Sequence, residues 1–426
     1  MSDQNTNPPF QSFPLHIPRP KDAPLPLAGV RVADFTRYMA GPYCTQTLCD
    51  LGAEVIKIEA VEGGDETRTF IPPEIDGESP YFLGLNRGKR SVALNLASEG
   101  GRRVARDIVA ACDIVVENFS PGVMERLGLS EPDLRKVRPD IIYCAISGYG
   151  SGTSHADQPG FDSVFQAETG FMSMTGASNG PPMRTGSPII DIASAMQATT
   201  AILAALVARH VHGDGQRVEV SMFDTGLAIL GYQSMNYLSG GGDPVRQGNE
   251  AAVATPIGLF DTADGGQLYV SCGSQRSWIA LAKHVLERPD LVEDPRFSDN
   301  RRRNENRLDL TEIMERIFSG APRDHWIGKA RAGRVPIGAV RTVGEAMEAT
   351  LTRERGLVSR IEDASGRQVP NIGSPLRFDR TPVADPQPAP RLGADTEPVL
   401  RTWLGYDDAC MEKARRDGAF SPRKPK

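Results

Sequence analysis

The sequence lacks the paired cysteines on which a disulfide framework or a structural zinc site depends. Its six cysteines contain no Cys-x-x-Cys spacing, which favours a reducing compartment. It has no basic excess either, because 48 Lys and Arg stand against 54 Asp and Glu, so a nucleic-acid partner is disfavoured. No apolar run reaches about 18 residues, and no basic-then-apolar leader opens the sequence. We therefore expect a cytoplasmic protein that binds neither nucleic acid nor membrane.

Several signatures of nucleotide and catalytic sites are also missing. No Gly-x-Gly-x-x-Gly follows the first expected strand and no P-loop pattern occurs, which weakens the dehydrogenase and P-loop hypotheses. Neither His-Glu-x-x-His nor Gly-x-Ser-x-Gly is present. His210 and His212 do not share a helix face, so they indicate solvated side chains rather than a metal site. Cys44 starts an expected helix, but the sequence offers no base that would make it a nucleophile.

What the sequence does contain is an alternation of short apolar runs with helical patterns. Strands that alternate with helices predict an α/β protein whose parallel sheet is covered on both faces. In such sheets, ligands bind in the loops at the carboxyl edge. Helices are expected near 44–51, 98–111 and 192–212. Strands are expected at 30–35, 54–59, 91–96, 113–118, 141–146 and 216–221.

The length of 426 residues predicts two or three domains, at roughly 100–200 residues per domain. Residues 1–26 are rich in proline and polar side chains, so we expect an extended N-terminal arm. The remaining chain is expected to form a large Rossmann-like domain at 27–225, a linker at 226–250, a small α+β domain with a hairpin at 251–370, a proline-rich linker at 371–395, and a C-terminal helical segment at 396–426 that returns to the large domain.

A set of short motifs occurs in a fixed order along the chain. They are Val32-Ala33-Asp34-Phe35-Thr36, Ala40-Gly41-Pro42, Leu51-Gly52-Ala53-Glu54-Val55-Ile56-Lys57-Ile58-Glu59, Asn86-Arg87-Gly88-Lys89-Arg90-Ser91, Val116-Glu117-Asn118-Phe119-Ser120-Pro121-Gly122, Gly148-Tyr149-Gly150, Gly160-Phe161-Asp162, Gln166-Ala167-Glu168-Thr169-Gly170, Gly180-Pro181-Pro182 and Ile190-Asp191-Ile192. In that order the set resembles the class III CoA-transferases, a family that holds formyl-CoA, carnitine and dicarboxylate CoA-transferases and α-methylacyl-CoA racemase. The resemblance runs from about Leu27 to the C-terminus. It implies a Rossmann-like large domain, a smaller domain and a homodimer whose chains interlock as rings.

The resemblance also implies coenzyme A or an acyl-CoA as substrate, with no permanently bound cofactor and no metal. Without a P-loop, side chains must supply positive charge for the phosphates, and arginine suits this task because its planar fork pairs with phosphate oxygens. The candidates are Arg126 and the cluster of Arg87, Lys89 and Arg90, although a solvated basic loop would explain the cluster equally well. By resemblance, the CoA groove is also lined by Met39, Ala40, Leu94, Asn95, Asn118, Phe119, Pro159, Gly160, Phe161 and Asp162.

The transfer reaction needs a carboxylate nucleophile, and the resemblance assigns this role to Asp191, after the Gly180-Pro181-Pro182 turn. The carboxylate would attack the acyl-CoA carbonyl to give a mixed anhydride. The released CoA thiolate would then form an enzyme–CoA thioester, which the acceptor acid resolves. Positioned donors such as backbone N–H groups would stabilise the charged tetrahedral oxygen. A simple helix cap is the alternative role for Asp191, and it is compatible with the catalytic one.

Two other functions stay open. An acyl-CoA racemase or isomerase would use Asp191 as a base, but Phe161 stands where the racemase branch has its histidine. A non-catalytic acyl-CoA-binding homologue is the third hypothesis. Residues 250–254 lack the glycine run of the formyl-CoA transferases, and Met39 replaces a polar residue of that branch, so formate and oxalate are disfavoured. Arg184 is a candidate to hold a distal carboxylate, which favours a dicarboxylate such as succinate, although a surface arginine is equally compatible with the sequence.

Overall fold

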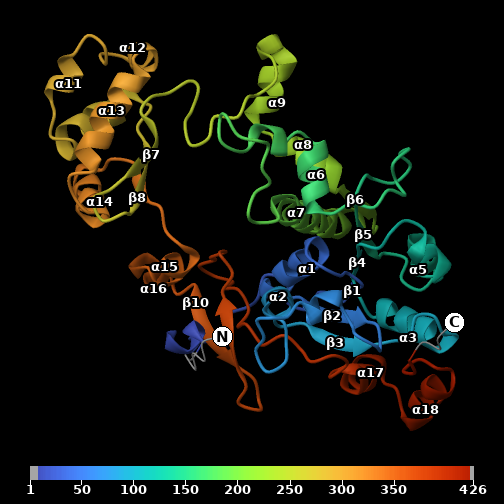
Figure 1. Ribbon diagram of the computed structural model, residues 1–426. Helices are drawn as coiled ribbons and strands as arrows, with labels where there is room; N and C mark the ends of the chain where they lie inside the picture. Colours follow the sequence, from blue (N-terminus) through green and yellow to red (C-terminus); the bar gives the residue numbers. More distant parts are fainter. Residues whose placement is uncertain (1–7, 423–426) are drawn as a thin grey trace. The chain divides into compact units, whose positions relative to one another are not determined.

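The computed structural model describes residues 8–422, and the chain divides into two compact units (Figure 1). The first unit holds the described residues up to 171, residues 185–235 and the described residues from 350 onward, while the second holds 172–184 and 236–349. The expected domain bounds stay a prediction, and these units divide the chain differently. Residues 172–184 belong to the second unit, and residues 350–370 belong to the first.

A six-stranded sheet organises the first unit. All neighbouring strands pair in parallel, in the order β3-β2-β1-β4-β5-β6. The central strands are buried on both faces, which explains their near-continuous Val and Ile runs. The expected α/β class with a parallel sheet is therefore confirmed. The strands are β1 (Arg31–Asp34), β2 (Glu54–Glu59), β3 (Arg90–Ala93), β4 (Ile114–Glu117), β5 (Ile142–Ser147) and β6 (Arg217–Ser221).

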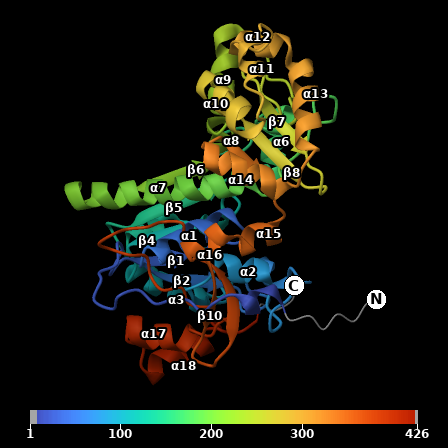
Figure 2. The same ribbon diagram turned by 90° about the vertical axis from the view of Figure 1, so that its left-hand side faces the viewer.

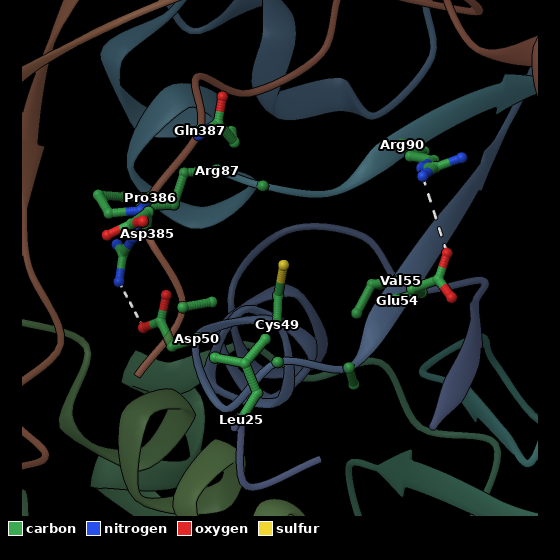
Figure 3. Close-up of a pocket in the computed structure, with 14 residues that line it drawn as sticks. Leu25, Cys49, Asp50, Glu54, Val55, Arg87, Arg90, Asp385, Pro386 and Gln387 are labelled. Carbon is green, nitrogen blue, oxygen red and sulfur yellow. Dashed lines mark hydrogen bonds and ion pairs between the residues drawn. The ribbon is translucent and has the colours of Figure 1, made fainter. Parts of the chain in front are cut away.

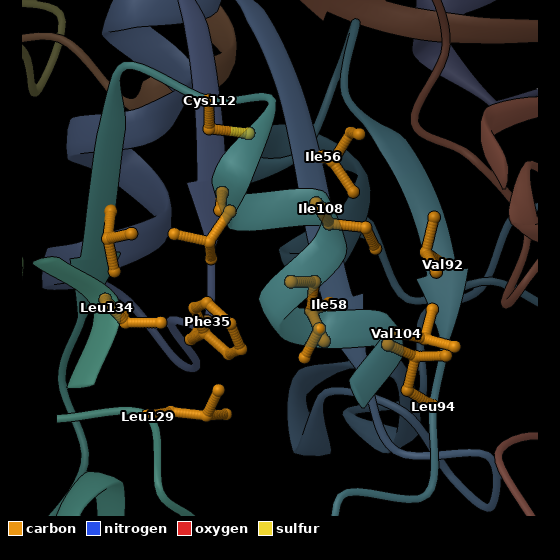
Figure 4. Packing of buried hydrophobic residues seen from close by; sticks show 14 of the residues in the cluster. Phe35, Ile56, Ile58, Val92, Leu94, Val104, Ile108, Cys112, Leu129 and Leu134 are labelled. Carbon is orange, nitrogen blue, oxygen red and sulfur yellow. The ribbon is translucent and has the colours of Figure 1, made fainter. Parts of the chain in front are cut away.

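Helices cover both faces of this sheet. The helices of the first unit are α1 (Ala40–Asp50), α2 (Pro80–Leu85), α3 (Glu99–Ala110), α4 (Val123–Arg126), α5 (Glu131–Arg135), α6 (Asp162–Glu168), α7 (Ile189–His212), α8 (Met222–Ala228), α9 (Tyr232–Asn236, which ends at the unit boundary), α16 (Thr350–Arg355), α17 (Thr396–Leu404) and α18 (Asp408–Arg416). α1 and α7 pack on the face that Val32 and Val55 occupy. α3 packs on the face that Ile56 and Ile58 occupy (Figure 4), where α17 and α18 join it from the C-terminus. Neighbouring residues such as Val55 and Ile56 face opposite ways because a strand is pleated.

α7 begins at Ile189, ahead of the expected start near 192, so Asp191 lies in its first turn. The helix has 24 residues and is long and apolar enough to cross a membrane, by length and composition only. It lies along β5 and β6 and packs against α1 (Figure 2). A helix that packs on a sheet in a globular protein can be equally long and apolar, so the composition of α7 does not by itself indicate a membrane span.

The N-terminal arm is fixed to its own unit over its described residues. It contains one 3-10 turn, η1 (Pro9–Ser12), and further turns at 21–22 and from 26, and it lies along β10 (Val358–Glu362), which pairs antiparallel with β11 (Gln368–Ile372). The His16 N–H donates to the Arg360 carbonyl at 2.8 Å, and Phe13 is buried. The His16 ring nitrogen Nε2 also lies 3.0 Å from an Asp385 carboxylate oxygen. The arm therefore joins the returning C-terminal part of the chain.

The second unit has an antiparallel sheet in the order β7-β8-β9 and a core around Trp278. The hairpin expected between 255 and 272 is present as β7 and β8. Its elements are β7 (Ile257–Asp261), β8 (Gln267–Ser271), β9 (Ile337–Ala339), α10 (Gln275–Ala280), α11 (Asp290–Glu293), α12 (Asn300–Glu305), α13 (Arg307–Phe318), α14 (Arg323–Gly333) and α15 (Val343–Glu348). The remaining short helical turns are η2 (Glu66–Thr69) in the first unit and η3 (Met172–Met174), η4 (Tyr237–Gly241) and η5 (Leu281–Val285) in the second.

Candidate active site

Asp191 lies in the first turn of α7, and side chains from α6 complete that turn. Pro188, which precedes the helix, has no side chain that caps it. Instead, the Asp162 carboxylate oxygen Oδ1 accepts hydrogen bonds from the N–H groups of Ile190, at 2.7 Å, and Asp191, at 3.1 Å. The Gln166 amide donates to the other Asp162 oxygen. These contacts pair N–H groups that a helix end otherwise leaves unsatisfied, so another helix fixes the backbone that carries Asp191.

Two carboxyl groups therefore share one helix end. Burial, and then the negative charge of Asp162, raise the pKa of Asp191 to about 7. The positive end of the α7 dipole favours a charged group here, but burial has the larger effect. A carboxyl group with this pKa exists in both forms near neutral pH. Perturbed groups of this kind concentrate at sites where side chains react.

Aromatic side chains lie close to this helix end. Burial, and then the charges of Asp191, Asp65 and Asp162, raise the pKa of Tyr81 to about 12, which puts the Tyr81 phenol within electrostatic reach of Asp191. Tyr81 lies in the first turn of α2 and meets the Phe70 ring edge-on, with ring centroids 5.5 Å apart. No pattern in the sequence indicates that Tyr81 lies near Asp191, because a tyrosine in an apolar segment predicts ordinary core packing.

A groove of about 420 Å³ opens at the carboxyl edge of the sheet, beyond β2 and β3. Three of the residues expected to line the CoA groove lie in its wall: Leu94, Asn95 and Phe119. Arg37 also lines it, with its guanidinium carbon 4.9 Å from the centre of the Phe119 ring. Most of the wall is otherwise apolar. The groove therefore offers a flat cation and an aromatic ring to a ligand that has both polar and apolar parts.

Asn118 and Arg126 lie near this groove, Asn118 in hydrogen bonds between two loops and Arg126 as an exposed cation. The Asn118 side chain accepts the Arg37 N–H and donates to the Arg37 carbonyl, both at 2.8 Å, so it joins the loops after β1 and β4. Arg126 is exposed at the end of α4, between Val123 and Leu127, which both line the groove. Among residues 8–422, no carboxylate forms an ion pair with Arg126. Arg126 therefore retains free donors beside the groove.

The other expected CoA residues are more dispersed. Met39 and Ala40 begin α1, where Ala40 is buried. Pro159 lies in an exposed loop before α6. A Cβ at Gly160 would come within 2.4 Å of the Phe165 ring, so packing alone requires glycine there. Phe161 is 64% exposed.

Asp162 conflicts with its expected role as a CoA contact. Its carboxylate is buried and both of its oxygens are occupied, one by the end of α7 and the other by Gln166. Its position indicates a group that orients Asp191, and we leave it out of the CoA groove.

The expected role of Lys89 also conflicts with its position. Its ammonium group is fully buried and lies 3.1 Å from an Asp34 carboxylate oxygen. It also donates to the Pro42 carbonyl, the Thr45 hydroxyl and the Asn86 side-chain oxygen. An ammonium group has three donors, so none remains for a CoA phosphate.

Arg90 lies at the opposite edge of the sheet from the groove. It is the first residue of β3, where its guanidinium is 3.7 Å from the Glu54 carboxylate at the start of β2. A separate cavity of about 170 Å³ lies here, and it also contains the partly buried ion pair between Arg87 and Asp50, at 2.5 Å (Figure 3). Arg87 and Arg90 therefore lie apart from the groove at the carboxyl edge. Lys89 and Arg90 are neighbours in sequence, but the Lys89 ammonium group is buried beside Asp34 whereas the Arg90 guanidinium lies near Glu54 at the start of β2.

Two further features bear on the chemistry. Among residues 8–422, no group of three or more His, Cys, Asp or Glu side chains is placed to hold a metal ion. Arg184, the candidate for a distal carboxylate, belongs to the second unit, whereas Asp191 belongs to the first. Its role toward a substrate therefore stays a prediction.

Comparison with known proteins agrees with the geometry. The model of CoA-transferase family III matches residues 27–396. The succinyl-CoA:glutarate CoA-transferase of Mus musculus is 33% identical over 405 residues, covering 95% of this chain and 92% of that protein. The acetyl-CoA:oxalate CoA-transferase of Acetobacter aceti is 36% identical over 354 residues, covering 83% and 89%. A solved CAIB/BAIF family protein from Brucella suis has a TM-score of 0.81 at 33% identity, covering 89% of this chain and 100% of that one. The expectation of an enzyme that transfers CoA is confirmed, and the chain belongs to CoA-transferase family III.

Proposed function

We propose that Asp191 is the nucleophile that carries the transfer of CoA from an acyl-CoA to a carboxylic acid. The observation that carries this proposal is its place in the first turn of α7, partly buried and with a pKa raised to about 7 by burial and by Asp162. The carboxylate attacks the thioester carbonyl, which gives a mixed anhydride and CoA thiolate. The thiolate then attacks the Asp191 carbonyl, releases the donor acid and leaves a thioester between CoA and Asp191.

The acceptor acid completes the cycle by the same two steps in reverse order. Its carboxylate attacks the Asp191 thioester and displaces CoA thiolate, and the thiolate attacks the acceptor carbonyl of the new anhydride. This releases the new acyl-CoA and regenerates the Asp191 carboxylate. We propose a dicarboxylate such as succinate as one of the acids, because relatives are named for succinate and glutarate.

The groove at the carboxyl edge is our proposed CoA site. Leu94, Asn95 and Phe119 line it, and Arg126 beside it supplies charge for the phosphates. The sheet order 3-2-1-4-5-6 supports a Rossmann-like classification, since folds with that order bind ligands at their carboxyl edge. Met39 and Ala40 are proposed to line the path from this groove toward Asp191.

A homodimer is part of the proposal. Along α7, the apolar side chains of Met196, Val207 and Val211 are 55%, 65% and 65% exposed. They recur at helical spacing on one face, and a surface of this kind is typical of a protein contact. Interlocked chains, as the family resemblance implies, would cover this face. Six cysteines without a disulfide support the cytoplasm as the compartment.

The direct test is to trap the intermediate. Incubation of the protein with succinyl-CoA and no acceptor should leave CoA or succinyl on Asp191, which hydroxylamine converts to a hydroxamate that peptide mass spectrometry locates. Asp191→Asn should lose the adduct and transfer activity while it still binds CoA. Asp224→Asn is the matched control, because Asp224 also lies in the first turn of a helix but is exposed. Transfer by Asp191→Ala would refute the proposal. Exchange of the α-proton with deuterated solvent, without transfer, would favour a racemase.

A further inference from the structure

The loop between β1 and α1 has a conformation that its sequence does not favour. Tyr38 has a φ of 63°, in the left-handed region that side chains other than glycine and asparagine rarely adopt. A residue persists in such a conformation only where its surroundings over-determine it. The contacts of this loop therefore indicate which groups keep Tyr38 in this conformation.

Two buried lysines hold carbonyl groups on either side of Tyr38, one in this loop and one in the first turn of α1. The Lys57 ammonium donates to the Thr36 carbonyl at 2.8 Å, and the Lys89 ammonium donates to the Pro42 carbonyl at 3.0 Å. Both ammonium groups are almost fully inaccessible to solvent. The two donors thus hold the chain on both sides of Tyr38, while the Asn118 amide holds Arg37 between them.

Charge balance makes these lysines possible. Lys57 pairs with Asp65 at 2.9 Å, and Lys89 pairs with Asp34 at 3.1 Å, all four side chains being at most 1% exposed. Asp34 and Lys57 are register partners on β1 and β2, so their side chains share one face of the sheet. The Asp34 carboxylate also accepts the Thr36 N–H at 2.9 Å.

Such a network is a costly way to stabilise a fold. Buried ion pairs lose so much solvation that apolar side chains of similar volume often give equal or greater stability. The four buried charges therefore do something that apolar packing would not. Both ammonium groups donate to backbone carbonyls that flank Tyr38, and Asp34 accepts the Thr36 N–H, so one specific result of the network is the position of the chain around Tyr38.

The loop reaches the candidate active site through Tyr38. The Tyr38 ring meets the Phe161 ring edge-on, with centroids 6.0 Å apart and planes at 79°. Phe161 directly precedes Asp162, whose carboxylate holds the Asp191 N–H. We propose that Lys57 and Lys89 are positioning residues for CoA transfer, which act by holding Tyr38 against Phe161 and thereby fixing one wall of the site beside Asp191. This inference rests on the proposed role of Asp191.

We call Lys57 and Lys89, with their hydrogen bonds to the Thr36 and Pro42 carbonyls, the clamp. The test compares variants of the clamp with a matched control. Lys89→Met and Lys57→Met each remove one lysine of the clamp, and Tyr38→Gly removes the ring while glycine adopts the left-handed backbone freely. The control is Arg209→Met. Arg209 is also a largely buried cation, 17% exposed, that bonds Asp113 and two backbone carbonyls, but it does so at the amino ends of β4 and β5.

Turnover with succinyl-CoA and glutarate should separate positioning from mere stability. A wall misplaced by about 1 Å can cost about 100-fold in rate, so we expect Lys89→Met and Tyr38→Gly each to lower kcat by about 10- to 100-fold. KM for succinyl-CoA should change less than about threefold. The double variant Lys89→Met/Tyr38→Gly should be no slower than the slower of its two single variants, because both changes remove the contact between Tyr38 and Phe161. Tyr38→Phe should keep kcat, and Arg209→Met should lower the melting temperature but leave kcat unchanged.

Several outcomes would overturn the inference. If the effects of Lys89→Met and Tyr38→Gly on kcat multiply, Lys89 does not act through Tyr38. If Lys89→Met and Lys57→Met lose stability but keep kcat, the lysines are structural only. Amide hydrogen exchange of residues 36–43 gives a readout that needs no activity: it should be faster in Lys89→Met than in the wild type or in Arg209→Met, and unchanged exchange refutes the clamp. Absence of an Asp191 adduct in the wild type, by contrast, refutes the proposed function itself.

Discussion

The Asp162 carboxylate oxygen Oδ1 lies 3.1 Å from the backbone nitrogen of Asp191, so one aspartate caps the helix turn that carries the other. The arrangement has two opposing effects on the candidate nucleophile. The hydrogen bond orients the backbone of Asp191, while the negative charge of Asp162 adds to burial in raising the pKa of the Asp191 carboxyl group to about 7. Positioning and activation therefore come from the same side chain.

Replacement of Asp162 by asparagine separates these effects. Asp162→Asn keeps an oxygen that accepts the two N–H groups but removes the charge. The reacting form of Asp191 is the carboxylate, so the rate rises as pH increases through its pKa. We expect the acidic limb of kcat/KM against pH to move to lower pH by about one unit, with burial still holding the pKa above its ordinary value. An unmoved limb, measured from pH 5 to 9, would show that Asp162 does not act on Asp191 electrostatically.

The same pKa predicts that Asp191 lowers the stability of the folded protein at neutral pH. Its ordinary pKa is 3.8 and its folded value is about 7, so between these values the folded state binds more protons than the unfolded state. Stability therefore falls as pH rises through this range, by up to about 4 kcal/mol above the folded pKa. Asp191→Asn, which does not titrate, should have a higher melting temperature than the wild type at pH 8. Near pH 4 the difference should largely vanish, and equal melting temperatures at both pH values would contradict the prediction.

The large domain was predictable because its strands are short apolar runs whose burial depends on local pattern. β2 lies at Glu54–Glu59, as expected from the sequence, and β1 and β6 end within one residue of their expected ends. The unit boundaries were less predictable. The β10–β11 hairpin follows the second unit in the chain but belongs to the first unit, and its partner, the N-terminal arm, is more than 300 residues away in sequence.

In the candidate site, too, the sequence alone does not predict contacts between side chains that are far apart in the chain. Asp191 is predicted from its motif, but the proposed role of Asp162 depends on a contact between two helices that are separated in the chain. Lys89 and Arg90 are neighbours in sequence, yet one ammonium group is buried against Asp34 while the other cation lies at the amino edge of the sheet. Which of two adjacent basic residues faces a ligand depends on strand register, and one sequence does not specify that register.

If the two chains interlock as proposed, we expect a dimer that dilution does not separate into monomers. Rings that pass through each other part only when one chain unfolds, so no folded monomer should form at any concentration. Sedimentation velocity from micromolar to nanomolar protein should show one species of twice the chain mass. Met196→Glu and Val207→Glu, on the exposed face of α7, should lower the melting temperature of that dimer. A stable folded monomer at high dilution would exclude the interlocked arrangement.

Arg126 and Arg90 provide a paired test of the CoA site, because they lie at opposite edges of the sheet. Arg126→Ala removes free donors beside the groove, and a charge-assisted contact of about 1.5–3 kcal/mol predicts CoA affinity that is weaker by about tenfold or more. Arg126→Lys should recover part of it, since lysine keeps the charge but not the planar fork. Arg90→Ala should leave affinity unchanged, because Arg90 faces Glu54 and the Trp403 ring. Calorimetric titration with CoA measures all three. The loss for Arg126→Ala should shrink as salt screens the phosphates, whereas an equal loss for Arg90→Ala would place CoA at the amino edge and overturn the proposed groove.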